Sequence, residues 1–257
     1  MNPTLFDSIP IASCYLIIAT TMLAFGEVGY QLGKHAQTRQ DKAATSALGP
    51  MVGGLLGMLG FALAFIFSMA SSHHDLRKQN VLKEANSIGT AYLRADLIDE
   101  QYETKVKSML RNYVDIRLEA VSAEDIAPAI AKSIEIHGLL WEQVSAAALE
   151  APNHNTSLMI QAANDIIDMH EKRVAGALYS RIPRSVWIAL IGITVLTMLA
   201  MGAQVGLTGK RRLVAMIPLI MAFAVLATLV IDLNRPQSGL IKVGQQSMID
   251  LQRSMRR

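Results

Sequence analysis

Four long apolar stretches divide this sequence and constrain its fold more than any other feature. They occupy roughly residues 11–33, 48–70, 186–206 and 213–231. Each is close to the ~20 residues that an α-helix needs to cross the ~30 Å hydrocarbon core of a bilayer. A segment within lipid must satisfy its own backbone hydrogen bonds, so each stretch is expected to be helical. The sequence therefore predicts an integral membrane protein that crosses the lipid bilayer with four helices.

The charge of the chain excludes one class of partner. Of the 257 residues, 51% are hydrophobic and 18% are charged, and the formal net charge is +3. The charged residues are missing mainly from the apolar stretches. The positive charge is mild and dispersed, and no basic run is interleaved with aromatic residues, so nucleic acid is not an expected partner. The single cysteine, Cys14, can form no intrachain disulfide and offers no metal-site spacing.

The polar segment between the two pairs of apolar stretches has the pattern of a helical bundle. Its breaks fall at Ser122, Pro128 and Pro152, and Ser122 is expected to be an N-cap. Helices are predicted over about 72–99, 100–120, 122–150 and 153–181. The predicted fold is an all-α membrane protein with four transmembrane helices in two hairpins and an inserted antiparallel helical bundle.

The same reading divides the chain into parts. We expect a first transmembrane hairpin over 1–70, an extramembrane helical bundle over 71–184, a second hairpin over 185–231, and a C-terminal turn and tail over 232–257. Nothing breaks the chain between Ala70 and Arg77, so the second membrane helix is expected to continue directly into the bundle.

The second apolar stretch differs from the other three. Pro50 stands in its first turn, where a missing N–H costs nothing. Small residues then recur every three or four positions, which lets membrane helices approach closely; these are Gly53, Gly57, Gly60, Ala64 and Ser68. A second row, at a spacing of four, consists of Phe61, Phe65 and Met69. The pattern fits close packing within the chain, or a helix that lines a pore or the core of an oligomer.

No pattern typical of a catalytic site is present. The sequence has no glycine-rich phosphate loop, no His-Glu-x-x-His and no serine elbow. His73, His74 and Asp75 are adjacent, and neighbouring residues on a helix point about 100° apart, so they make a poor metal chelate. The sequence therefore predicts neither an enzyme nor a bound metal or cofactor.

Polar residues on faces that should be buried are the remaining candidates for a site. They are Glu84, Asn86, Arg94, Asn164, Asp168, Arg173, Asp232 and Arg235. Opposite charges on neighbouring helices could pair, for example Glu84 or Asp168 with Arg235, which would offset their desolvation. The set is either a group of structural ion pairs or a polar vestibule on an ion path.

Several strings, taken in order, resemble the bestrophin-like family of bacterial membrane proteins. They are Leu63-Ala-Phe-Ile-Phe-Ser, Glu84-Ala-Asn-Ser-Ile-Gly-Thr-Ala-Tyr-Leu-Arg-Ala-Asp, Tyr113-Val-Asp-Ile-Arg-Leu and Asp232-Leu-Asn-Arg-Pro-Gln-Ser-Gly. Single positions between them continue the match, namely Trp141, Asn164, Asp168, Arg173, Ile182-Pro183 and Trp187. The match covers nearly the whole chain, although the family commonly has Asp where Asn234 stands.

This resemblance implies a function that the residues alone do not. Bestrophins are pentameric channels permeable to chloride or to cations, so a homo-oligomer that conducts inorganic ions is implied. Their second membrane helix lines a hydrophobic neck, for which Phe61, Phe65 and Met69 are the candidates here. The row of small residues would then pack helices around the axis. A location in the bacterial inner membrane is also implied.

The side of the membrane on which the bundle lies stays open. The two short loops carry Lys34, Arg39, Lys42, Lys210, Arg211 and Arg212, and short basic loops favour the cytoplasm, which would place the bundle outside. The helical domain of bestrophins is cytosolic, which points the other way.

Two functions follow for testing. One is an oligomeric ion channel with a pore lined by the second transmembrane helix. The other is a non-conducting sensor or interaction protein, in which the bundle binds a partner and the hairpins are an anchor.

Overall fold

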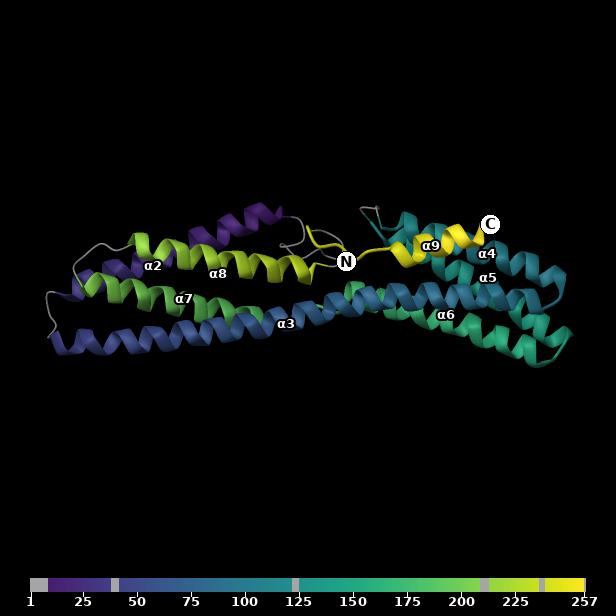
Figure 1. Cartoon of the computed structure of the whole chain (residues 1–257), viewed down its shortest axis with the longest axis horizontal. Coiled ribbons are helices and arrows are strands. Elements are labelled where there is room, and N and C mark those ends of the chain that lie inside the picture. Colours follow the sequence, from purple (N-terminus) through teal and green to yellow (C-terminus); the bar gives the residue numbers. More distant parts are fainter. Residues whose placement is uncertain (1–8, 38–41, 122–124, 209–212, 236–238, 257) are drawn as a thin grey trace. The chain divides into compact units, whose positions relative to one another are not determined.

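The chain folds into helices throughout its described regions. The computed structural model describes residues 9–37, 42–121, 125–208, 213–235 and 239–256, and every regular element in these ranges is helical (Figure 1). The all-α fold class is therefore confirmed at this level.

Within the described ranges, four helices are long and apolar enough to cross a membrane. They are α2 (Ile11–Gln37), α3 (Lys42–Arg94), α7 (Arg184–Leu207) and α8 (Leu213–Asn234). The helix α3 has 53 residues and runs on past the apolar stretch without a break, as the sequence predicts. Pro50 lies inside α3 and not in its first turn, because the helix already begins at Lys42.

The remaining elements are shorter. They are the 3-10 helix η1 (Ala95–Leu97), α4 (Glu100–Glu119), α5 (Ala127–Glu150), α6 (His154–Leu178) and α9 (Gln246–Met255). Asp99 caps α4, and Asn153 with Thr156 forms a capping box at the start of α6. The expected N-cap Ser122 lies outside the described residues. A C-terminal turn and tail were expected over 232–257, and the helix α9 is an addition to that expectation.

The chain forms two compact units, each built from two separate segments. The membrane unit consists of Met1–His74 and Arg181–Lys242, and the bundle unit of Asp75–Ser180 and Val243–Arg257. In the membrane unit, α2 packs against α7 and α8. Its apolar core includes Leu59, Leu63 and Ile66 of α3.

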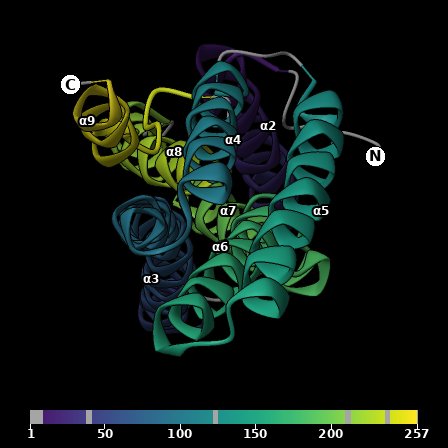
Figure 2. The ribbon, with the colours of Figure 1, turned by 90° about the vertical axis from the view of Figure 1, so that its right-hand side faces the viewer.

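In the bundle unit, each helix has one buried apolar face. Helix α5 packs between α4 and α6, and the short helix α9 packs on α4 (Figure 2). The core residues include Ile88, Leu110, Leu140, Ile166 and Met248. Burial of each large side chain contributes about 1.5–3 kcal/mol to stability, so this shared core holds the polar residues of the bundle in place.

Candidate functional site

One face of α3 packs into its own chain and the other face does not. Val52, Leu59 and Leu63 are buried. On the opposite side, Phe61 and Phe65 are 75% and 60% exposed. Met69, the third neck candidate, is half-buried.

The small residues of α3 also lie toward this open side. A Cβ atom added to Gly53, Gly57 or Gly60 would meet nothing within 4 Å among the described residues. Ala64 and Ser68 are exposed. In the described chain, then, this row of small residues packs against no other helix.

A second set of glycines makes the close helix contact that the first set does not make. Gly29 and Gly33 of α2 face the backbone of Leu199 and Ala203 in α7. The contact is reciprocal, since two α7 glycines, Gly202 and Gly206, face the backbone of α2. Small residues four apart on both helices allow this approach. The sequence analysis overlooked this interface.

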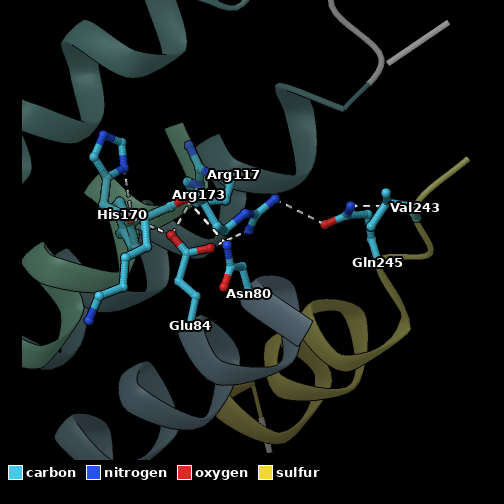
Figure 3. A network of polar contacts seen from close by, with 9 residues as sticks. Asn80, Glu84, Arg117, His170, Arg173, Val243 and Gln245 are labelled. Atoms are coloured by element: carbon cyan, nitrogen blue, oxygen red, sulfur yellow. Dashed lines mark hydrogen bonds and ion pairs between the residues drawn. The ribbon is translucent and has the colours of Figure 1, made fainter. Parts of the chain in front are cut away.

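Glu84 of α3 presents a fully buried carboxylate with three partners (Figure 3). Arg173 of α6 donates to its Oε2 through Nη1. The Nε of Arg117 in α4 lies 3.3 Å from its Oε1, and the hydroxyl of Tyr113 donates to the same oxygen at 2.7 Å. The two guanidinium groups compensate the desolvation of the carboxylate, which would be costly if it were unpaired.

These partners determine the charge states in the cluster. Burial raises the pKa of Glu84, but the charges of Arg173 and Arg117 and the bond from Tyr113 outweigh burial, so the net pKa is lowered. Burial and the charge of Glu84 raise the pKa of Tyr113 well above its usual value. Burial lowers the pKa of Arg173. At neutral pH the cluster therefore contains one carboxylate and two guanidinium cations.

Two buried histidines lie beside Tyr113. The Nδ1 of His170 in α6 is 3.1 Å from the Tyr113 hydroxyl. The ring of His137 in α5 meets the ring of His170 edge to face, with centroids 4.8 Å apart. Because Tyr113 gives its only proton to Glu84, Nδ1 of His170 is the donor in their bond. Burial is the main cause that lowers the pKa of each histidine to about 4, so both are neutral at neutral pH.

Arg173 also connects this cluster to the residues that precede α9. Its Nη2 donates to Oε1 of Gln245 at 3.3 Å, and Nε2 of Gln245 donates to the carbonyl of Val243 at 3.2 Å (Figure 3). Asn80 of α3 donates to the carbonyl of Lys172 at 3.3 Å. Polar contacts thus join α3, α4, α6 and the start of α9 within the bundle unit.

Of the predicted polar candidates, the structure brings Glu84 and Arg173 into direct contact. Asn86, Asn164 and Asp168 are exposed on the chain. Arg94 donates through Nη1 to the carbonyl of Leu158 at 2.8 Å, so it ties α3 to α6. The sequence analysis did not select Tyr113, Arg117, His137, His170 or Gln245 as site residues.

Asp232 and Arg235 belong to a turn at the end of α8. The carboxylate of Asp232 accepts the N–H groups of Leu240 and Ile241, both at 2.9 Å. Gly239 has a φ of 135°, and a Cβ there would overlap Oδ1 of Asp232. Within the membrane unit, Arg235 donates to the carbonyl of Ile9 at 2.8 Å. Within the bundle unit, Glu84 is held by Arg173 and Arg117, and the suggested pairing of Glu84 or Asp168 with Arg235 stays a prediction.

Asp232→Asn is expected to destabilise this turn by about 1–3 kcal/mol, because an amide NH₂ would replace one of the two acceptors that face backbone N–H groups. The melting temperature of the purified protein in detergent measures the loss. Asp75→Asn changes an exposed aspartate and is the control. Equal melting of the two variants would contradict the role assigned to Asp232.

Comparisons with known proteins agree with the fold. The Bestrophin-like domain model matches residues 17–248. A crystal structure of a bacterial bestrophin homologue from Klebsiella pneumoniae with a mutation has 13% identity and a TM-score of 0.59, covering 96% of this chain and 97% of that chain. A second mutant structure of that homologue has 14% identity and a TM-score of 0.59, covering 93% and 96%.

A further structure of the Klebsiella pneumoniae homologue, determined by Zn-SAD phasing, has 15% identity and a TM-score of 0.57, covering 95% of this chain and 97% of that one. These likenesses establish the fold. No curated protein matches the sequence. The family model extends over nearly the whole chain, and with the four apolar helices it establishes an integral membrane protein that belongs to the bestrophin-like family.

Proposed function

We propose that this protein is an oligomeric ion channel of the bacterial inner membrane, with a pore lined by α3. The observation that carries the proposal is the open face of α3. Phe61 and Phe65 are largely exposed there, and Gly53, Gly57 and Gly60 meet no other part of the described chain.

A second copy of the chain is a better neighbour for this face than lipid. Glycine in a helix interior costs about 1 kcal/mol relative to alanine, so a row of glycines needs a compensating contact. Membrane helices gain such a contact when small residues let their backbones approach. Copies of α3 arranged around an axis satisfy this requirement, and the resemblance to bestrophins supports five copies.

The phenylalanines give the pore a hydrophobic constriction. An apolar ring can gate conduction because water and hydrated ions leave it readily. Phe61, Phe65 and Met69 would form successive rings of this neck. Asn86 lies on the same helical face as Phe61 by the 3.6-residue period, and we assign it, with the exposed Asn164 and Asp168, to a polar vestibule.

Phe65→Ala is expected to raise the single-channel conductance severalfold, since it widens the apolar constriction. Purified protein reconstituted into planar bilayers provides the measurement. Phe67→Ala is the matched control, because Phe67 is on the same helix but points about 200° away from Phe65. Equal conductance changes in both variants would contradict a neck at Phe65.

The non-conducting alternative makes opposite predictions. A sensor or interaction protein that is only anchored by its hairpins needs no shared axis. Two results together would favour this alternative over the channel. The protein in mild detergent would have the native mass of one or two copies, and bilayers that contain folded protein would show no conductance.

A further inference from the structure

The two buried histidines have incomplete hydrogen bonding. The Nε2 atoms of His137 and His170 are buried and have no hydrogen-bond partner among the described residues. A proton added at either ring would introduce a positive charge and an N–H donor that has no acceptor there. Burial of such a donor is costly, so the packed bundle resists protonation of this pair.

The surrounding charges increase this resistance. The ionisable groups packed around the pair are Glu84 from α3, Tyr113 and Arg117 from α4, and Arg173 from α6. The residues Val243, Gly244 and Gln245 add no charge. Two arginines face one glutamate, so an imidazolium would enter a region whose net charge is already positive.

Of the three charged members of the cluster, Arg173 has the most exposed side chain. Its side chain retains 12% exposure, whereas Glu84 has none. Movement of Arg173 to solvent would separate its charge from a protonated histidine. The same movement would break its bond to Gln245, the residue that immediately precedes α9.

We propose that His137 and His170 form a proton-binding site that releases the C-terminal helix α9 from the bundle when it is occupied. The proposal does not depend on ion conduction, so each of the two can fail without the other.

The direction of the pH effect follows from linkage. In the packed state the pKa of each histidine is about 4, and in a state opened to water it returns toward the ordinary value of 6.5. The opened state therefore binds more protons between these values, and its population rises as the pH falls from 6.5 to 4. At pH 5 a single histidine favours the opened state by about 20-fold relative to neutral pH.

Other contacts hold α9, and one of them includes a titratable group. Tyr92 and Arg111 donate to the carbonyl of Met255, at 3.3 and 3.0 Å. Asp115 of α4 pairs with Arg256 at 3.1 Å. Because Asp115→Asn removes this ion pair and leaves both histidines in place, it separates the two kinds of contact that hold α9.

Hydrogen–deuterium exchange of the full chain in detergent tests the proposal. Protection of the α9 amides, corrected for intrinsic exchange, is expected to fall at least ~10-fold from pH 7.5 to pH 5.0, given the linkage above. The double variant His137→Gln/His170→Gln should lose this response. His154→Gln, which changes an exposed histidine of α6, and Asp115→Asn should both keep it.

Two results would overturn the proposal: unchanged protection of α9 at pH 5.0 in the unmodified protein, or a pH response that persists in the double variant. Gln245→Leu provides a second test if the double variant fails to fold. It should lower the protection of α9 already at pH 7.5 and remove most of the further change with pH. A full pH response in Gln245→Leu would refute the coupling through Arg173.

Discussion

Glu84→Gln is expected to lower the free energy of unfolding by about 3–5 kcal/mol, because it leaves two buried arginines without their counter-charge. Arg173 and Arg117 both face this carboxylate, and the Glu84 side chain has no exposed surface. Denaturant or thermal unfolding of the purified protein in detergent measures the loss.

Two further variants test whether charge compensation is the cause. Asp168→Asn neutralises an exposed carboxylate on α6 and should change stability by no more than about 0.5 kcal/mol. Adding Arg173→Gln to Glu84→Gln removes one of the uncompensated charges, so the double variant should be more stable than Glu84→Gln alone. If Glu84→Gln unfolds at the same temperature as the unmodified protein, the ion pairs of Glu84 do not stabilise the bundle.

Gly202→Ala is expected to destabilise the membrane unit by about 1–3 kcal/mol, or more if α2 and α7 cannot separate slightly. A Cβ at this position would overlap the carbonyl oxygen of Gly26 and approach the backbone nitrogen of Tyr30. Both are main-chain atoms of α2, so no side-chain rotation relieves the overlap. The loss of melting temperature in detergent is the measurement.

Gly192→Ala is the matched control for this prediction. Gly192 is on the same helix, and a Cβ there meets nothing within 4 Å among the described residues. Alanine favours a helix over glycine by about 1 kcal/mol, so stability should stay the same or rise slightly. A similar loss in both variants would mean that helix α7 is sensitive to any added methyl group.

The membrane helices and the continuity of α3 could be predicted because they depend on local pattern. An apolar run of ~20 residues is sufficient to predict a membrane helix. Glu84 and Arg173 were also identified, since charge on a helix that should be buried is conspicuous. Their partners were not identified, because a contact between helices that are far apart in the sequence produces no periodic pattern of residues. One signal was present: Tyr113 and Arg117 continue the buried row of Val106 and Leu110 in α4.

The glycines illustrate a different limit. The sequence analysis selected the row in α3 but not Gly29 and Gly33 or Gly202 and Gly206, which have the same spacing of four. Spacing indicates that a helix can be approached closely. It does not indicate whether the neighbour belongs to the same chain. The tail helix α9 was missed because ten residues are too few for a stable isolated helix, and its stability comes from packing on α4.

The position of α9 in the bundle unit has a consequence for biosynthesis. Met248 and Met255 belong to the core that α4, α5 and α6 build, and they follow these helices in chain order. The earlier helices of the bundle therefore expose apolar surface until α9 has been synthesised, which is the condition that chaperones recognise in nascent chains. Synthesis of α9 is then the step that completes the apolar core of the bundle.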